Sequence, residues 1–357
     1  MSFLYCKPSV FAIGNRYEIL INTLENGQCA IKIDGKNYVS ERAGILLSET
    51  TVHKISVPQS ALDKAGCYTV LWRKSIDKKS YFSVFGEWEK EDFSFRGIGD
   101  KTNIKIYHVA DVHYEFDKGV ALSKFYGDDT DLFVINGDIG EVEKVQDFLD
   151  VAKFSGDVSN GERPVVFTRG NHDTRGKLAS EFSLYFPTKN DKYFYTINFN
   201  KIRIIVLDCG EDKVDEHVEY GGANLFSPYR KKQTEFLKNI KKIDDKITFC
   251  ISHMCPGRVE AYNPAFQIEE DTYRKWIKEL ERIETSFMLV GHTHKTGIFL
   301  PNQAVLPHNY PVIVGSALSN DKTTALGAGL ELTSARSIKV KFTDTDCNVV
   351  EEYEIKI

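Results

Sequence analysis

The sequence has little of three features that would point to particular classes of protein. No apolar run approaches the roughly 20 residues of a membrane-spanning helix, and the start, Met1 to Pro8, is too short and too interrupted for the core of a signal peptide. The 51 acidic and 46 basic residues give a net charge of -5. Since there is also no long basic run, the chain lacks the electrostatic footprint of a nucleic-acid or membrane binder, and we expect neither partner.

Cysteine is also sparse, and its spacing is irregular. The seven cysteines, at positions 6, 29, 67, 209, 250, 255 and 347, form no disulfide framework and no zinc-type pair. An odd, scattered set predicts reduced and partly buried thiols, which are typical of a reducing compartment. We therefore expect a cytoplasmic protein. No feature of the sequence predicts the oligomeric state.

The length and composition are sufficient for more than one hydrophobic core. The chain has 357 residues, of which 42% are hydrophobic and 12% aromatic, and this size favours two domains or one large domain. The glycine-spaced stretch from Arg96 to Asp100 is typical of a boundary. We predict one domain over residues 1–98 and a second over residues 99–357.

Residues 1–98 predict a small all-β sandwich of immunoglobulin or fibronectin III kind. Turn signals at Glu25–Gly27 and Asp34–Asn37 separate short β-rich runs, and no helical period competes. His53 is expected to be a strand residue, because no metal-binding or nucleophilic residues cluster near it. We identify no exposed aromatic platform in this region. The expected strands are Ser9–Ile13, Tyr17–Thr23, Gln28–Ile33, Asn37–Ser40, Thr51–Val57, Cys67–Arg73 and Tyr81–Phe85.

From residue 101 onward, apolar strands alternate with amphipathic helices. This alternation predicts an α/β layered fold. The expected strands are Ile104–Ala110, Leu132–Asn136, Val165–Thr168, Ile202–Leu207, Ile247–Ser252 and Phe287–Val290, and the expected helices are Val142–Phe154, Lys177–Phe186, Arg230–Ile243 and Asp271–Ile283. After Gly297 the pattern returns to strands, which we expect to complete a second sheet packed on the first.

Short polar motifs follow five of these strands, and together they predict a two-metal site. Thr168 to Asp173 contains Asn171, whose amide oxygen can bind a metal, and His172, which can donate a proton. The other motifs are Asp111-Val112-His113, Gly137-Asp138, His253 and Gly291-His292-Thr293-His294. Each motif is a weak signal alone. Five of them, each at the end of a strand where side chains can converge, predict a metal centre.

The residue types divide into two ligand sets that share one carboxylate. One metal would take Asp111, His113, Asp138 and His294, and the other Asp138, Asn171, His253 and His292. Asp138 can bridge the two ions because a carboxylate has two oxygens. Mixed oxygen and nitrogen ligands suit manganese, iron or zinc better than calcium or magnesium. We therefore expect two divalent or trivalent metal ions as cofactors.

The ordered motifs resemble those of the calcineurin-like metallophosphoesterase superfamily. The resemblance covers residues from about 104 to 294 and implies a four-layer α/β/β/α sandwich, the ligand sets given above, and contact between His172 and the substrate. The preceding β-sandwich is similar in arrangement to that of purple acid phosphatases. Those proteins have a tyrosine ligand three residues after the bridging aspartate, where this chain has Glu141. This difference argues against a purple, tyrosine-ligated ferric site.

The expected function is hydrolysis of a phosphoester by a water that the two metals activate, with His172 as the general acid. We favour a phosphomonoesterase or protein phosphatase, acting on a phosphorylated small molecule or a phosphoprotein, over a phosphodiesterase that cleaves cyclic nucleotides or other diesters. Two alternatives belong to other classes. The fold could be a non-catalytic binding scaffold, or the N-terminal sandwich could be the functional part and tether a partner or glycan.

Three further residues and one segment leave alternatives open. Asp173 could orient His172 in catalysis or cap a helix. Arg169 and Arg175 could bind substrate phosphate or be solvated surface residues. The acidic segment from Cys209 to Tyr229 could be a substrate loop or a solvated one. Because every predicted ligand lies beyond residue 101, a fragment that begins near Lys101 is expected to retain its metals.

Overall fold

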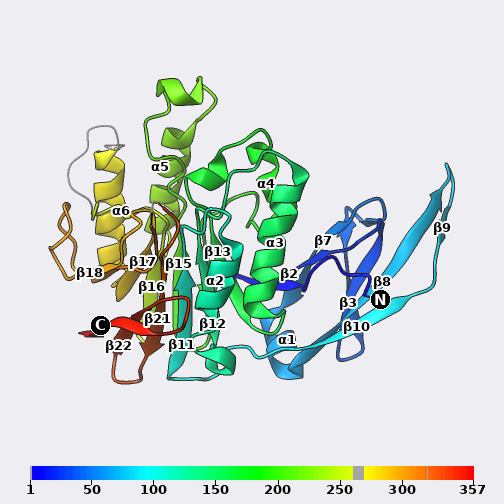
Figure 1. The fold of residues 1–357 in the computed structure, drawn as a ribbon, viewed down its shortest axis with the longest axis horizontal. Helices are drawn as coiled ribbons and strands as arrows, with labels where there is room; N and C mark the ends of the chain where they lie inside the picture. Colours follow the sequence, from blue (N-terminus) through cyan, green and yellow to red (C-terminus); the bar gives the residue numbers. More distant parts are fainter. Residues whose placement is uncertain (1, 260–268, 320) are drawn as a thin grey trace.

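The computed structural model describes residues 2–259, 269–319 and 321–357. The chain forms a layered α/β body, and an all-β region extends from one side of it (Figure 1). Two facing sheets form the centre of the body, and helices cover the outer face of each sheet. The predicted four-layer arrangement and the preceding all-β region are both confirmed.

The first sheet combines strands from both ends of the sequence. Its spatial order is β23 (Val349–Lys356), β22 (Ser337–Thr343), β21 (Ala325–Leu332), β11 (Ile104–Val109), β12 (Leu132–Asn136), β13 (Pro164–Thr168), β1 (Ser9–Ile13), β2 (Arg16–Asn22) and β7 (Val52–Pro58), with β20 (Ala317–Leu318) beside β21. Strands β11, β12 and β13 are parallel neighbours, so their carboxyl ends lie along one edge. That edge carries the first three polar motifs.

The second sheet is shorter and mostly parallel. Its order is β14 (Tyr195–Asn198), β15 (Ile202–Val206), β16 (Ile247–Ile251), β17 (Phe287–Val290), β19 (Val312–Val314) and β18 (Gly297–Phe299). Strands β15, β16, β17 and β19 run parallel. The motifs of His253 and His292 follow β16 and β17, and they therefore face the motifs of the first sheet.

Short helices connect and cover these strands. They are α1 (Gln59–Ala65), α2 (Phe116–Ser123), α3 (Val145–Ser159), α4 (Phe182–Tyr185), α5 (Phe226–Lys238) and α6 (Glu270–Arg282), with 3-10 turns η1 (Gly127–Asp129), η2 (His172–Thr174), η3 (Ala179–Glu181) and η4 (Val218–Tyr220). Helices α2 and α3 cover the first sheet, and α5 and α6 cover the second. Helix α1 lies within the region where we expected no helix, between Pro58 and the left-handed Gly66.

Alternate residues of one strand enter different hydrophobic cores. In β12, Val134 joins the core between the sheets, whereas Phe133 and Ile135 pack under α3. In β16, Phe249 faces the first sheet and Cys250 faces α5 and α6. Strands that are buried on both faces need continuous apolar sequences, and these are the runs that identified them in the sequence.

The all-β region is a sandwich in which one layer continues the main sheet. Its separate layer has the order β10 (Glu89–Ser94), β8 (Cys67–Lys78), β3 (Gly27–Ile33) and β4 (Lys36–Val39), with β9 (Ser83–Phe85) beside β8 and a hairpin of β5 (Glu41–Arg42) and β6 (Ile45–Leu46). Its other layer is β1, β2 and β7, and β1 pairs in parallel with β13. The boundary after residue 98 remains a prediction, but the two parts share a sheet.

This shared sheet changes the expectation for a fragment that begins at Lys101. Removing β1 would leave β13 without its neighbour and would expose inner core residues such as Val166. We now expect the fragment to aggregate or to unfold without cooperativity, as measured by thermal melting and size-exclusion chromatography. A chain in which only the turn from Lys79 to Phe82 is replaced by Asn-Gly is the control and should melt normally. A monomeric fragment with an unchanged melting temperature would contradict this expectation.

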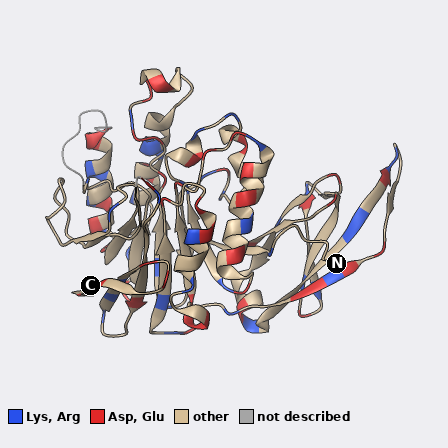
Figure 2. Ribbon diagram, viewed as in Figure 1, with Lys and Arg blue, Asp and Glu red and all other residues tan. Residues whose placement is uncertain are grey.

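Strands β8, β9 and β10 extend from the sandwich as an arm (Figure 1). The arm exposes the aromatic side chains of Tyr81, Phe82 and Trp88, which the sequence alone did not identify as a group. At its base, the Arg73 guanidinium stacks on the rings of Phe85 and Trp88. Acidic and basic residues are interspersed on the arm and on the helices (Figure 2). No helix in the described residues is long and apolar enough to cross a bilayer.

Candidate metal centre

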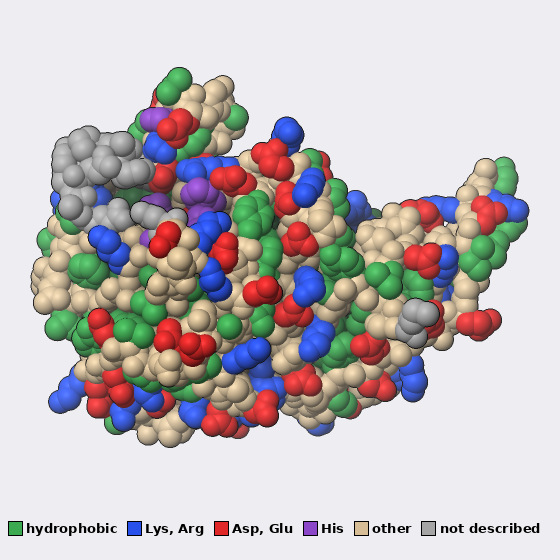
Figure 3. Space-filling model, viewed as in Figure 1, with side chains coloured by type: hydrophobic (Ala, Val, Ile, Leu, Met, Phe, Trp, Pro, Cys, Tyr) green, Lys and Arg blue, Asp and Glu red, His purple; other side chains and the backbone are tan. Residues whose placement is uncertain are grey.

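The seven predicted ligands converge between the carboxyl ends of the two sheets. Asp111 and His113 follow β11, Asp138 follows β12, and Asn171 follows β13. From the second sheet, His253 follows β16, and His292 and His294 follow β17. Histidine side chains gather on this edge of the molecule (Figure 3). Residues up to 183 positions apart in the sequence therefore meet because their strands end at one place.

Most of these ligands have a strained backbone. Five of them adopt left-handed φ angles: Asp111 (55°), His113 (43°), Asp138 (52°), His292 (73°) and His294 (55°). Residues other than glycine rarely adopt this conformation, and each costs of order 1 kcal/mol or more unless the surroundings fix it. Strain that is concentrated at one cluster is typical of a functional site.

The glycines of the motifs allow the loops to approach one another. Gly137 has φ of +77°, and a Cβ atom there would lie 2.4 Å from the backbone nitrogen of Gly170. A Cβ atom on Gly291 would lie 2.8 Å from Oδ2 of Asp111. Both positions exclude a side chain because the ligand-bearing loops touch there. The close contact between the loops explains why glycine precedes Asp138 and His292 in these motifs.

The first ligand set has its donor atoms directed at one another. Nε2 of His113 lies 3.0 Å from Nε2 of His294, which in turn lies 3.5 Å from Oδ1 of Asp111. Nε2 of His113 is also 3.9 Å from Oδ2 of Asp138. These are the four residues predicted for one metal.

The second set lies on the other side of Asp138. Nε2 of His253 is 3.2 Å from Oδ2 of Asp138. Nδ1 of His292 is 3.0 Å from Oδ1 of Asn171. Asp138, His253 and His292 offer donor atoms that all lie within 4.8 Å of one another. Asp138 is therefore common to both sets, as a bridging carboxylate must be.

The protonation states favour metal binding by the imidazoles. Burial lowers the pKa of His113 to about 4 and that of His292 to about 4, and it also lowers the pKa of His294. These rings are therefore neutral at neutral pH, which is the form that binds metals. Burial raises the pKa of Asp111 to about 7, with a further contribution from the charge of Asp138. A nearby cation would keep that carboxylate ionised.

His253 gives the most direct test of whether these residues fit a metal. Its Nδ1 lies 2.6 Å from the carbonyl oxygen of Asn136, so Nδ1 carries a hydrogen and Nε2 is the atom directed at the other ligands. That Nε2 is buried, has no hydrogen-bond partner, and faces the carboxylates of Asp138 and Asp111 at 3.2 and 3.7 Å. Burial lowers the pKa of His253, but the two carboxylates outweigh it and raise that pKa to about 10. The two carboxylates therefore favour a positive charge at Nε2, either a proton or a metal ion, and the residues fit a bound metal.

His172 lies beside the ligands and is held at both ring nitrogens. Nδ1 is 3.1 Å from Oε1 of Glu141, and Nε2 is 3.2 Å from Nη1 of Arg175. Because arginine can only donate, Nε2 accepts and Nδ1 carries the hydrogen in this arrangement. Nε2 is also 4.0 Å from Oδ2 of Asp138, so His172 is close enough to the metal ligands to touch a substrate bound to them.

Asp173 has a different position from the one predicted for a catalytic residue. Its buried carboxylate accepts hydrogen bonds from the backbone amides of Gly170 (2.7 Å), Asp138 (2.9 Å), Ile139 (3.1 Å) and Gly140 (3.4 Å). It therefore ties the loop after β12 to the loop after β13. We propose that Asp173 positions the ligands and neither orients the His172 ring nor meets substrate.

The two predicted phosphate-binding arginines differ in their surroundings. Arg169 is mostly covered, with 11% of its side chain exposed, and donates to Oδ2 of Asp208 at 2.7 and 3.2 Å, with its guanidinium stacked on Tyr193. These contacts leave the Arg169 guanidinium little capacity to donate hydrogen bonds to a substrate. Arg175 is bound to both carboxylate oxygens of Glu211 at 3.0 and 2.9 Å, but its Nη1 faces His172. We retain the proposal of substrate contact for Arg175 alone.

The acidic segment after β15 supports the site through Arg175. Glu211 and Asp212 are buried, and both accept from Arg175 and from the Tyr220 hydroxyl. Asp215 accepts from the first backbone amides of α5. The segment is therefore neither a simple solvated loop nor a free acidic surface. The carboxylates of Glu211, Asp212 and Asp215 all take part in structural hydrogen bonds.

Sequence reasoning gave no role to Glu141 beyond the missing tyrosine and did not identify Tyr114. Glu141 holds His172, and the Tyr114 hydroxyl donates to the Glu141 carbonyl oxygen. The available signal was the position of Glu141, three residues after Asp138 and at the mouth of the same loop. For Tyr114, adjacency to His113 was the only signal.

Comparisons with known proteins agree with this fold. The structure of purple acid phosphatase PPD1 from yellow lupin (Lupinus luteus) is similar with a TM-score of 0.65 and 11% identity, over 98% of this chain and 74% of that one. The structure of PhoD is similar with a TM-score of 0.59 and 10% identity, over 99% of this chain and 89% of that one. Comparison with curated protein sequences gives no significant match. At these identities, the likenesses establish the fold.

The family follows from the sequence of the layered body. The calcineurin-like phosphoesterase family matches residues 104–296, which is more than half of the chain. With its convergent aspartates and histidines, the protein is a metallophosphoesterase, a hydrolase of phosphoesters. The chain belongs to the calcineurin-like phosphoesterase family, as the motifs predicted.

Proposed function

We propose that this protein hydrolyses phosphomonoesters, with a two-metal centre held by the seven predicted ligands and His172 as the general acid. The observation that carries the proposal is the convergence of two ligand sets on the shared Asp138, with His172 beside them. The buried Nε2 of His253, which faces the carboxylates of Asp138 and Asp111 at 3.2 and 3.7 Å, is in the position of a ligand to a shared metal.

The ligands fit manganese, iron or zinc, because neutral imidazoles, carboxylates and an amide oxygen are the donors that these ions accept. Asp111, His113, Asp138 and His294 would hold one ion, and Asp138, Asn171, His253 and His292 the other. When bound, the two ions supply Lewis acidity toward phosphoryl oxygens and a water that is acidic enough to be a nucleophile. Several protein groups hold the ligands in place, including the Asn136 carbonyl behind His253 and the His292 amide that donates to Asp111.

His172 would move a proton to the departing oxygen of the substrate. Glu141 holds its Nδ1 and so fixes the orientation of the ring. Nε2 now accepts from Arg175, so a substrate must take over the hydrogen bond from Nη1 before Nε2 can carry and donate a proton. The same guanidinium can then donate to a phosphoryl oxygen. Binding and proton transfer would thus be coupled through Arg175.

The surroundings of His172 favour one organic group on the phosphate. An open cavity of about 360 Å³ is lined by Glu141, His113, His294 and His172 itself. The Nε2 side of His172 faces Arg175, which is fixed in a cluster with the buried Glu211 and Asp212. A monoester needs room for one leaving group, which the cavity offers. A diester needs room for a second group.

A panel of esters on metal-loaded protein tests this proposal. We expect kcat/KM for p-nitrophenyl phosphate to exceed that for bis(p-nitrophenyl) phosphate, with manganese, iron or zinc present and no turnover after chelation. A reversed order would favour the phosphodiesterase. If the metal-loaded protein turned over neither ester nor a phosphopeptide, the non-catalytic scaffold would be the better account.

The remaining expectations on partners and location stay proposals. A phosphorylated small molecule or phosphoprotein remains the expected substrate class, and neither nucleic acid nor a membrane is expected as a partner. All seven cysteines lie in the described residues and are unpaired, which supports a reducing compartment such as the cytoplasm.

A further inference from the structure

The cavity beside the metal centre has one wall that no motif predicted. Its lining residues are His113, Tyr114, Gly140, Glu141, His172, His294, Leu318, Ser319 and Lys322. Leu318 ends β20, and Ser319 and Lys322 lie between β20 and β21, outside residues 104–296. Among the described residues that line the cavity, Lys322 is the only lysine or arginine. The cavity therefore has an ammonium group in its wall, as well as the carboxylate of Glu141.

Hydrogen bonds hold the turn that carries Lys322 in one shape. Oδ1 of Asp321 accepts from the Ser319 hydroxyl at 2.6 Å and from the backbone amide of Thr323 at 3.0 Å. The ammonium of Lys118 donates to the carbonyl oxygen of Lys322. Lys322 itself has φ of 57°, a strained value that persists only where the surroundings impose it. The backbone position from which its side chain extends is thus fixed by these contacts.

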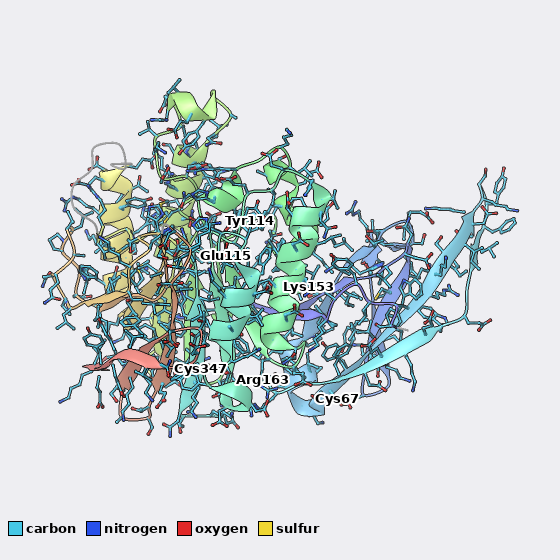
Figure 4. The ribbon with its side chains drawn as sticks, in the orientation of Figure 1. Cys67, Tyr114, Glu115, Lys153, Arg163 and Cys347 are labelled. Atoms are coloured by element: carbon cyan, nitrogen blue, oxygen red, sulfur yellow. The ribbon has the colours of Figure 1, made fainter. Side chains whose placement is uncertain are left out.

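The Lys322 ammonium has spare hydrogen-bonding capacity. It donates to the carbonyl oxygen of His113 at 3.1 Å and lies 3.6 Å from Oε1 of Glu115. Glu115 is shared, because its Oε2 lies 3.1 Å from the Lys118 ammonium. An ammonium has three N–H groups, so at least one remains for a ligand. Tyr114 and Glu115 lie together just before α2 in Figure 4.

Lys322 is placed to meet the organic part of a substrate. It contacts the backbone of His113, whereas the ligand atom Nε2 is at the far end of that side chain, 3.0 Å from Nε2 of His294. If a phosphate is held at the ligand atoms, the His113 side chain therefore separates it from the Lys322 ammonium. The other charged wall residue, Glu141, is engaged with His172.

We propose that Lys322 forms a subsite for an oxyanion, such as a carboxylate, on the leaving group of the phosphoester. This inference rests on the proposed hydrolysis at the metal centre and adds a substrate class to it. Preferred substrates would be phosphomonoesters whose alcohol or phenol carries a second negative charge. The ammonium would exchange part of its contact with Glu115 for the substrate.

Two esters of equal shape test the subsite. We compare 4-carboxyphenyl phosphate with 4-carbamoylphenyl phosphate, which replaces the carboxylate by a neutral amide. In Lys322→Gln, the ratio of kcat/KM for the carboxylate ester to that for the amide ester should fall about tenfold, as for loss of one charge-assisted hydrogen bond. Lys322→Arg should restore most of the ratio. Lys79→Gln on the distant arm removes the same charge and should leave the ratio unchanged.

A second variant should move the ratio in the opposite direction. Glu115→Gln removes the carboxylate that competes for Lys322, so the preference for the carboxylate ester should rise. It also tests the subsite if Lys322→Gln folds poorly, which its melting temperature would reveal. Equal losses on both esters in Lys322→Gln, with no change in Glu115→Gln, would overturn the subsite.

Binding separates this inference from the proposed function. The probes are 4-carboxybenzyl and 4-carbamoylbenzyl phosphonate, which cannot be hydrolysed, titrated calorimetrically into metal-loaded protein. If no ester is turned over, the proposed reaction fails, and the two affinities still decide the role of Lys322. Tighter binding of the carboxylate probe that disappears in Lys322→Gln supports the subsite. Equal affinity of wild-type protein for both probes overturns it.

Discussion

Replacing His172 with alanine should slow the hydrolysis of an alkyl phosphate by about 10²–10⁴-fold, the usual contribution of a general acid, and slow p-nitrophenyl phosphate much less. The difference arises because an alkoxide needs a proton to depart and nitrophenolate does not. His172 lies 4.0 Å from Asp138 through its Nε2 and is held in orientation by Glu141, so it is placed to reach a leaving oxygen.

The variant must also retain its metals. His172 could join His113 and Asp138 in a ligand set, because their donor atoms lie within 4.8 Å of one another. Metal content measured by mass spectrometry distinguishes these roles, and His217→Ala, at a partly exposed histidine in the acidic segment, is the matched control. Loss of one metal from His172→Ala would assign His172 to the coordination shell. Equal losses of kcat/KM on both esters would assign it to phosphate positioning.

Replacing Asp138 with asparagine should remove both metals and reduce turnover to background. Oδ2 of Asp138 lies 3.9 Å from Nε2 of His113 in one ligand set and 3.2 Å from Nε2 of His253 in the other. A neutral amide has one oxygen donor and no charge, so it cannot bridge two cations as a carboxylate does. Metal stoichiometry and kcat/KM on p-nitrophenyl phosphate check this expectation.

The control for Asp138 lies at the other end of the same strand. Asp131 is buried just before β12, where it accepts from the Lys105 backbone amide, so Asp131→Asn perturbs a buried carboxylate outside the metal centre. It should retain both metals and turnover even if it lowers the melting temperature. An Asp138→Asn protein that binds two metals and turns over normally would contradict the bridging role.

The sequence predicted the central strands well because they are buried on both faces. The expected strands at Ser9–Ile13, Leu132–Asn136 and Phe287–Val290 agree with the structure residue for residue. Helix α6 was also predicted, because Tyr273, Trp276, Ile277 and Leu280 recur at helical spacing and are all buried. In these elements, the apolar residues that form the local sequence pattern are the same residues that the tertiary structure buries.

Elements that depend on distant contacts were missed. Helix α2 was not predicted, and it contains Gly119, a poor helix former, at a point where a Cβ atom would lie 2.6 Å from the ring of Phe154. The expected helix at Lys177–Phe186 is instead the short η3 and α4, because Phe182 and Phe186 pack as aromatic contacts with Phe167. Tertiary packing overrides local preference in both cases.

The pairing of β1 with β13 could not be read from the sequence either. Both strands were predicted, but Phe11 and Val165 are far apart in the chain, and nothing local specifies that they pair. For the same reason the N-terminal region appeared to be independent of the layered body. The structure makes it part of the same sheet.

The metal ligands were predictable because their motifs combine glycine, strand ends and donor side chains over a few residues. Their supporting groups were not, because they depend on long-range contacts. Glu211, which holds Arg175, is 36 positions away from it, and Lys322, which contacts His113, is 209 positions away. The chemistry of the centre is thus encoded locally, and its positioning and selectivity are encoded in the tertiary structure.

The most direct test of the two-metal centre is anomalous X-ray diffraction from crystals of the metal-loaded protein, recorded at the absorption edge of the bound metal. We predict two peaks, one among Asp111, His113, Asp138 and His294 and the other among Asp138, Asn171, His253 and His292. Both peaks should contact Asp138, and neither should contact His172. A single peak, or a peak ligated by His172, would contradict the account.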